Sequence, residues 1–226
     1  MAGVRAVHTF DRHGSWLFAS VLGAALYYVV ARQPWPDGVL IALKGSGVAL
    51  LALWAWQAGP DGCERKMLAA ILALGAVADM VLELSLEAGA AIFLAGHLVA
   101  IWLYRSQRRP DPAASQKAAA TALLLIPPLL GWWLTRDPLV ALYATGLGAM
   151  AGAAWLSRYS RYRVGIGAVL FVVSDLLIFA RAAGNATALA DWLVWPLYYG
   201  GQFLIATGVI AAARQASAGG GSSRSG

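Results

Sequence analysis

The chain has 226 residues, of which 60% are hydrophobic and 12% charged, and its formal net charge at pH 7 is +6. Soluble domains carry about 25% charged residues, so this composition argues against a water-soluble globular protein and indicates an all-α, polytopic membrane protein. The basic residues lie in short segments between apolar runs, which is typical of cytoplasmic loops and not of a nucleic-acid-binding surface.

The apolar runs predict a transmembrane domain at 16–212 with eight transmembrane helices. In chain order the predicted spans are 16–31, 38–57, 66–86, 88–104, 118–134, 138–157, 164–184 and 190–212. Turn sequences such as AGPDG and RRPDP separate them. Residues 1–15 are expected to form a cytoplasmic N-terminal segment, and no convincing cleavage site follows the first apolar run, so the first span is expected to stay uncleaved. Residues 213–226 are low in complexity, which is typical of a flexible cytoplasmic tail or of a cloning remnant.

Lysine and arginine are distributed unequally between the two ends of the predicted spans. The end that carries the N-terminus holds thirteen of them, whereas the opposite end holds Arg32, Arg136 and Arg181. Cytoplasmic loops carry the excess of positive charge in membrane proteins. We therefore expect both termini to lie in the cytoplasm and the chain to reside in a bacterial inner membrane.

The ionisable residues inside the predicted spans that we single out are Lys44, Asp79, Glu83, His97 and Asp175. Such residues are costly in lipid, so each is a candidate functional residue. Counting from the span ends at about 1.5 Å per residue places them in one layer, in the half of the membrane away from the cytoplasm. The same layer contains three uncharged polar residues, Tyr198, Tyr199 and Gln202. We interpret the layer as one polar cavity that opens to that side.

Two aspartates occupy matching positions, Asp79 in VADMVLEL (77–84) and Asp175 in VSDLLIFA (173–180). Their spacing of 96 residues is what two related four-helix halves would produce. Asp79 and Glu83 are four residues apart and share a helix face. Carboxylates held close in a medium of low dielectric favour one protonated acid beside a charged partner, as general acid/base catalysis requires.

Simpler roles are open for several of these residues. Lys44 can neutralise Asp79 or Glu83 as an ion pair that fixes helix packing. His97 can be a hydrogen-bonded core residue, and Ser174 can bond to its own helix backbone. Packing explains at least one of the two adjacent tyrosines. A metal site formed by Asp79, His97 and Asp175 is an alternative, but the sequence shows no metal-ligand spacing, so we expect neither a metal nor another cofactor.

The order of the motifs resembles the YhhN-like family, which comprises membrane proteins of bacteria and animals that include lysoplasmalogenase. The resemblance covers about residues 16–212 and rests on Lys44, Asp79, F-x-x-x-H (93–97), LFVVSDLLI (170–178) and YY-x-x-Q (198–202). There are departures from the family pattern. Ala78 replaces the usual glycine before the aspartate, Gly45 stands where proline often follows the lysine, and Ala100 replaces a tyrosine.

The resemblance implies hydrolysis of the vinyl-ether bond of lysoplasmalogen-type lysophospholipids to a fatty aldehyde and a glycerophospho-base. Asp79 and Asp175 are then the expected catalytic pair, and the expected substrate-binding residues are Lys44, Glu83, His97, Ser174, Tyr198, Tyr199 and Gln202. The alternative hypothesis is a proton-coupled transporter of a lipid or small molecule that uses the same carboxylates. A third is a scaffold or sensor in which the polar layer only holds helices together.

Overall fold

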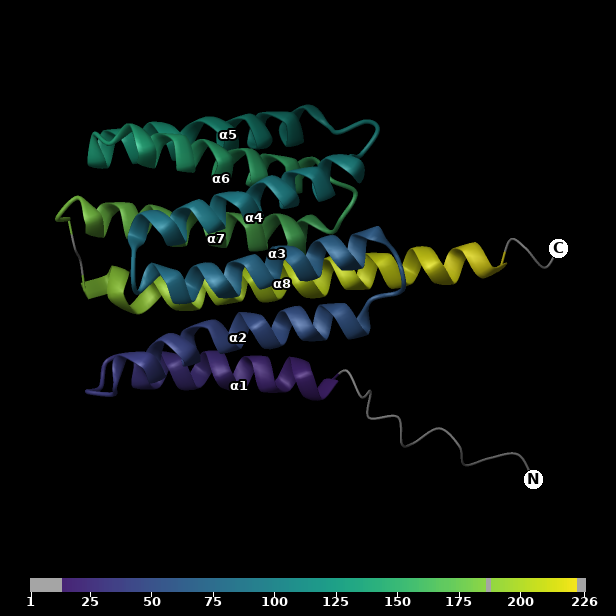
Figure 1. Ribbon diagram of the computed structural model, residues 1–226. Coiled ribbons are helices and arrows are strands. Elements are labelled where there is room, and N and C mark those ends of the chain that lie inside the picture. Colours follow the sequence, from purple (N-terminus) through teal and green to yellow (C-terminus); the bar gives the residue numbers. More distant parts are fainter. Residues whose placement is uncertain (1–13, 186–187, 223–226) are drawn as a thin grey trace, which may run out of the picture.

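The structure is a computed structural model that describes residues 14–185 and 188–222, and over these ranges it is all-helical, as predicted (Figure 1). The α-helices are α1 (Gly14–Val30), α2 (Asp37–Ala58), α3 (Cys63–Leu82), α4 (Leu86–Ser106), α5 (Ala114–Thr135), α6 (Pro138–Leu156), α7 (Ile166–Ala182) and α8 (Ala188–Ser222), with a π-helical turn, η1 (Arg161–Gly165), before α7. Each predicted span corresponds to one of these helices.

Two boundaries differ from the prediction for reasons that the structure makes visible. The third helix ends at Leu82, because Ser85 begins α4 by accepting a hydrogen bond from the backbone N–H of Ala88. The last helix continues to Ser222 and so includes residues 213–222, which were expected to form a flexible tail. The remainder of that tail, 223–226, and most of the N-terminal segment lie outside the described residues.

Six helices of the described chain are long and apolar enough to cross a bilayer: α2, α4, α5, α6, α7 together with η1, and α8. The first helix is apolar but has 17 residues. The third has 20 residues, with Glu64, Arg65 and Lys66 close to its start. These lengths and compositions indicate an integral membrane protein.

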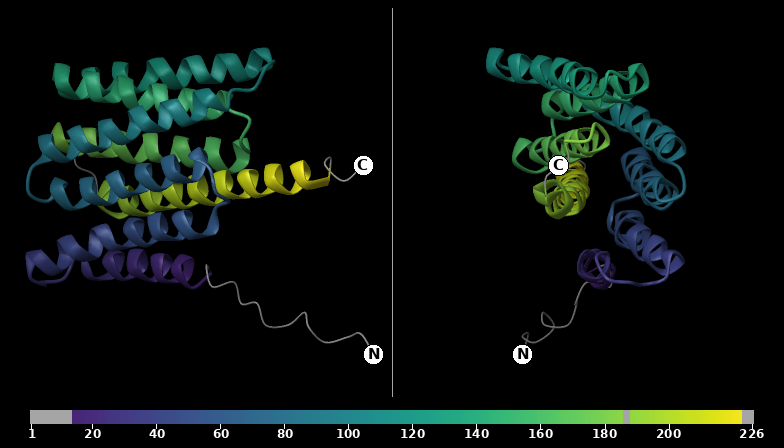
Figure 2. Two further views of the ribbon diagram at one scale, coloured as in Figure 1. Left: turned by 45° about the vertical axis from the view of Figure 1, so that its right-hand side comes forward. Right: turned by 90° about the vertical axis from the view of Figure 1, so that its left-hand side faces the viewer.

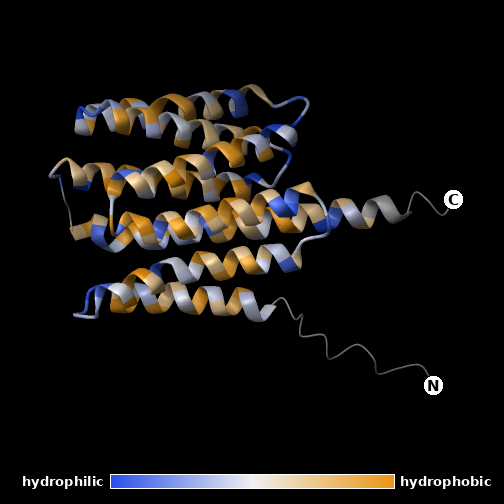
Figure 3. Cartoon of the chain, in the orientation of Figure 1, coloured by the Kyte–Doolittle hydropathy of each residue, from blue (hydrophilic) through white to orange (hydrophobic). Residues whose placement is uncertain are grey.

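The helices lie side by side with roughly parallel axes, in two rows (Figures 1 and 2). One row is formed by α2, α3 and α4, and the second by α7 and α8. The rows are joined at one side by α1, which contacts α2 and α8, and at the other by α6, which contacts α4 and α7. The remaining helix, α5, packs outside on α6 and α7. Figure 3 shows that hydrophilic residues gather mostly near the helix ends and connections. The first helices of the two predicted halves, α1 and α5, pack differently on the rest of the bundle. The relation between two four-helix halves therefore stays a prediction.

Glycines allow two helix pairs to approach closely. A Cβ atom added to Gly201 in α8 would lie 2.6 Å from the carbonyl oxygen of Gly167 in α7, so the two backbones touch here. A Cβ atom on Gly152 in α6 would lie 2.9 Å from the carbonyl oxygen of Ala120 in α5. Gly148 approaches α5 in the same way, so α6 packs on α5 through a face of small residues.

At the end of the bundle where α3 begins, the side chain of Glu64 contacts two neighbouring segments. Its carboxylate accepts hydrogen bonds from Gln107 Nε2 at 2.8 Å and from the Tyr159 hydroxyl at 2.8 Å, and it forms an ion pair with Arg158 at 3.2 Å. Burial raises the pKa of Tyr159 above its ordinary value, so its hydroxyl stays a donor. This cluster ties α3 to the connections that follow α4 and α6.

Candidate active site

Asp79 lies on α3 with 2% of its surface exposed, and a tyrosine holds its carboxylate. The hydroxyl of Tyr198, on α8, donates a hydrogen bond of 2.8 Å to Asp79 Oδ2. Gln202, one turn further along α8, is hydrogen-bonded to Tyr198 in turn. Gly75 makes room for both partners, because a Cβ atom there would lie 3.3 Å from the Tyr198 hydroxyl oxygen and 3.3 Å from Gln202 Nε2. The glycine one turn before Asp79 therefore lets α8 present its polar side chains to the carboxylate.

Asp175, on α7, is also buried and has a tyrosine partner. The hydroxyl of Tyr143, on α6, donates a hydrogen bond of 2.7 Å to Asp175 Oδ2, and His97 Nε2 on α4 lies 3.2 Å from the same hydroxyl. Three helices thus meet in one hydrogen-bonded chain. Tyr143 was not among the residues expected from the sequence, although it lies five residues into its predicted span, as deep as the polar layer.

An aromatic cluster fills the space between the two aspartate–tyrosine pairs. The ring of Phe171 lies 5.2 Å from that of His97 and 5.1 Å from that of Tyr198, measured between centroids. Phe93 lies 5.7 Å from Tyr198 in the same way. Asp79 and Asp175 are close enough to interact electrostatically, but none of the hydrogen bonds among the described residues joins their carboxylates directly.

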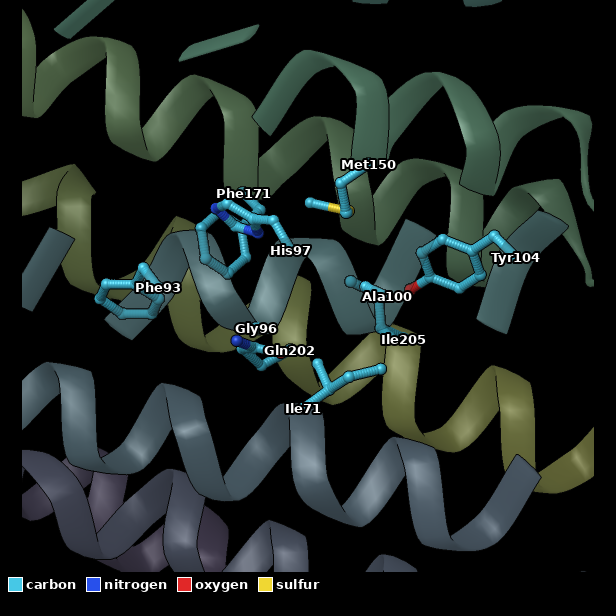
Figure 4. A pocket seen from close by; sticks show the side chains of 10 residues that line it. All are labelled: Ile71, Phe93, Gly96, His97, Ala100, Tyr104, Met150, Phe171, Gln202 and Ile205. Carbon is cyan, nitrogen blue, oxygen red and sulfur yellow. The ribbon is translucent and has the colours of Figure 1, made fainter. Parts of the chain in front are cut away.

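A small cavity of about 20 Å³ lies beside this cluster (Figure 4). Its walls are Ile71, Phe93, Gly96, His97, Ala100, Tyr104, Met150, Phe171, Gln202 and Ile205. A cavity of this volume is large enough for one water molecule. The imidazole of His97, the amide of Gln202 and the hydroxyl of Tyr104 supply polar groups in an otherwise apolar wall.

A larger vestibule of about 450 Å³ lies at the end of the bundle where α1, α3 and α7 end and α2 and α8 begin. It is lined by Tyr27, Tyr28, Ala31, Arg32, Lys44, Glu83, Arg181, Ala188, Asp191, Trp192, Val194 and Trp195. Lys44 forms an ion pair with Glu83 on its wall, as the simpler interpretation predicts, and is also close enough to Asp79 to interact with its carboxylate.

One continuous polar cavity was expected from the sequence, but the structure separates the vestibule from the buried aspartates. Trp195 lines the vestibule, and its ring lies 4.5 Å from that of Tyr27 and 5.7 Å from that of Tyr198. Its indole N–H donates to the carbonyl oxygen of Ala24 at 3.0 Å, which fixes the ring. An aromatic wall therefore stands between the vestibule and the tyrosine that holds Asp79.

Comparison with known proteins identifies the same family as the order of the sequence motifs. The sequence profile of the YhhN family matches residues 39–209, a range that includes both aspartates and every side chain of the two hydrogen-bonded clusters. The chain belongs to the YhhN family.

Among curated YhhN-type relatives, the proteins named lysoplasmalogenase from Mycobacterium bovis and Mycobacterium tuberculosis are each 32% identical over 219 residues, covering 86% of this chain and 83% of the relative. Lysoplasmalogenase TMEM86B from Sus scrofa is 28% identical over 202 residues, covering 87% of each chain. No solved structure matches the chain significantly.

Two polar residues of the YhhN motifs have hydrogen-bond partners other than the aspartates. Ser174 donates a hydrogen bond of 2.9 Å to the carbonyl oxygen of Val194 in α8, so the expected bond to its own helix is wrong. Tyr199 is hydrogen-bonded at 2.7 Å to Ser20 in α1 and therefore serves helix packing. In the described part of this YhhN chain, no three His, Cys, Asp or Glu side chains are arranged to hold a metal ion.

Proposed function

We propose that this chain is an ether hydrolase that cleaves the vinyl-ether bond of lysoplasmalogen-type lysophospholipids, giving a fatty aldehyde and a glycerophospho-base. The observation that carries the proposal is the pair of buried carboxylates, Asp79 and Asp175, each held by a tyrosine hydroxyl on either side of an aromatic cluster. Membership of the YhhN family, with curated relatives named lysoplasmalogenase, supports the same reaction.

The proposed reaction begins with transfer of a proton from a carboxylic acid to the alkenyl carbon that is not bonded to oxygen. The resulting oxocarbenium ion takes up water, and a proton returns to a carboxylate. The hemiacetal then collapses, so that the bond between the former alkenyl carbon and the glycerol oxygen breaks and one water is consumed. A protonated acid and an ionised carboxylate suffice for these steps. Asp79 and Asp175 share the two roles.

The surroundings of the aspartates suit a cationic intermediate. The faces of Phe93 and Phe171 can stabilise positive charge through their ring quadrupoles. The hydroxyls of Tyr198 and Tyr143 orient the carboxylates, and the water-sized cavity beside His97 gives the reaction a place for water. Lys44, already paired with Glu83, adjusts the charge balance near Asp79.

We further infer that all eight helices cross the membrane, with both termini in the cytoplasm of a bacterial cell and the vestibule at the opposite face. The unequal distribution of lysine and arginine between the two ends supports this orientation. A single-chain lipid would then reach the site from the outer leaflet.

The test is turnover by the purified protein of three lysophospholipids that share a headgroup and chain length but carry an alkenyl, an acyl or an alkyl chain. We expect aldehyde from the alkenyl lipid alone. In D₂O, prompt trapping of the aldehyde should reveal one deuterium on the carbon next to the carbonyl, because that carbon receives the proton. Failure of a well-folded protein to release aldehyde, or release without deuterium, would overturn the proposal.

A further inference from the structure

The vestibule contains three cationic side chains, and within the described residues two of them are paired with carboxylates. Lys44 is paired with Glu83, and Arg181 lies 3.4 Å from Asp191 Oδ1. Arg32 lines the same vestibule, but none of the ion pairs among the described residues includes it. One positive charge of the vestibule is therefore left unbalanced.

The guanidinium of Arg32 is nevertheless fixed in place. Its Nη1 donates to the carbonyl oxygen of Tyr28 at 3.0 Å and its Nη2 to the carbonyl oxygen of Asp191 at 2.7 Å. Its Cζ atom lies over two aromatic rings, 4.7 Å from the ring centroid of Tyr28 and 3.7 Å from that of Trp192. These contacts use two of its five N–H donors. A positioned guanidinium with free donors is well suited to a phosphate, whose oxygens match its planar fork.

The position of Arg32 in the bundle also sets it apart. Apart from Lys44, only three lysines and arginines of the sequence lie at or near this end of the predicted helices, and two of them, Arg32 and Arg181, line the vestibule. Positive charge is disfavoured at the end that faces away from the cytoplasm. Two arginines gathered in one vestibule at this end therefore indicate binding of an anion.

We propose that the vestibule is the headgroup subsite and that Arg32 binds the phosphate of the lysophospholipid. This inference rests on the proposed hydrolase function. Glu83 and Asp191 supply carboxylates for a positively charged base on the same headgroup. Glu83 follows Asp79 by four residues, so the vestibule wall stands about 6 Å along α3 from the aspartate. A glycerol unit between phosphate and alkenyl ether spans a comparable length, and the ring of Trp195 must shift for the ether to reach Asp79.

Kinetics with two alkenyl substrates test the subsite. One is an alkenyl lysophospholipid, and the other is an alkenyl glycerol that lacks the phosphate. For Arg32→Gln we expect KM for the phospholipid to rise about 10- to 100-fold, the loss that follows removal of a charged hydrogen-bond donor, with little change in kcat. Turnover of the alkenyl glycerol should not change. Arg136→Gln is the matched control, because it removes an exposed arginine at the same end of the bundle but outside the vestibule.

A binding experiment separates this proposal from the hydrolase proposal. The ligand is a non-hydrolysable alkyl lysophospholipid, and its binding is measured by the change in tryptophan fluorescence. If wild type releases no aldehyde but binds the alkyl lipid through Arg32, the hydrolase proposal fails and the subsite stands. If aldehyde is released and Arg32→Gln behaves like Arg136→Gln in both KM and binding, the subsite is overturned and the hydrolase proposal stands. Inorganic phosphate serves as the third ligand, and binding as tight as that of the lipid would identify a site for free phosphate, against the proposal.

Arg32→Lys keeps the test decisive where Arg32→Gln does not fold, since Arg32 also joins α1 to α8. Lysine retains the charge but offers a point charge in place of the planar fork. We expect this variant to bind the alkyl lipid several-fold more weakly than wild type, and wild-type affinity in folded Arg32→Lys would contradict the phosphate contact.

Discussion

Replacing Gly201 with alanine tests whether the backbone contact between α7 and α8 positions the site. The added Cβ atom would lie 2.6 Å from the carbonyl oxygen of Gly167 and 3.2 Å from the backbone nitrogen of Phe171. Carbon and oxygen atoms in such helix contacts normally stay at least about 3.3 Å apart, so the helices must separate by roughly 0.7 Å. Overpacking of this kind costs about 1–3 kcal/mol. In a chain of this size each kcal/mol lowers the unfolding midpoint by about 2–4 °C.

Gly200→Ala is the matched control, because a Cβ atom at the neighbouring position meets no atom within 4 Å. Both variants gain the same helix propensity, so their difference isolates the cost of the contact. We expect the midpoint of thermal unfolding in detergent to lie about 2–12 °C lower for Gly201→Ala than for Gly200→Ala. Aldehyde release should fall only in Gly201→Ala, since α8 also carries Tyr198. Equal unfolding midpoints for the two variants would refute the reasoning.

Two further substitutions address the hydrogen bonds at the site and at the opposite end. Tyr198→Phe removes the hydroxyl that donates to Asp79, and we expect kcat for steady-state aldehyde release to fall about 10- to 100-fold. Tyr199→Phe removes a hydroxyl that bonds to Ser20 in α1, and this variant should retain the wild-type kcat. Equal activity of the two variants would contradict the assigned role of the hydroxyl. Glu64→Gln removes the charge that holds Tyr159 and its neighbours, so we expect a midpoint lower by several degrees in thermal unfolding and an unchanged kcat. An unchanged midpoint would mean that the cluster contributes no stability.

The helices could be predicted from the sequence because apolar runs of about 20 residues separated by turn residues leave few alternatives in a membrane. Depth along a helix can be counted from the span ends in the same way, and this count places Asp79, Asp175, His97 and Gln202 in one layer. The end of the last helix could not be predicted, since small and polar residues allow both a helix and a flexible tail.

The partners within the layer could not be predicted, because they depend on the rotation of each helix about its axis and on which helices are neighbours. Tyr143 bonds to Asp175 across 32 positions of sequence, and no local pattern marks that contact. Tyr198 and Tyr199 are adjacent, yet they face different helices, so sequence alone could not say which one serves the site. In the sequence Arg32 is only a loop charge, and its role depends on the fold, which places α8 beside α1.

The most direct test of the central claim is aldehyde release by Asp79→Asn and Asp175→Asn, with Asp137→Asn as the control. Asp137 begins α6 by accepting a hydrogen bond from the N–H of Leu139 at 2.8 Å, and asparagine serves equally well in that position. We expect both site variants to keep the unfolding midpoint of the control while kcat falls by about 100-fold or more, as for loss of a general acid or base. Full turnover by either folded site variant would contradict the claim that the two buried aspartates carry out the reaction.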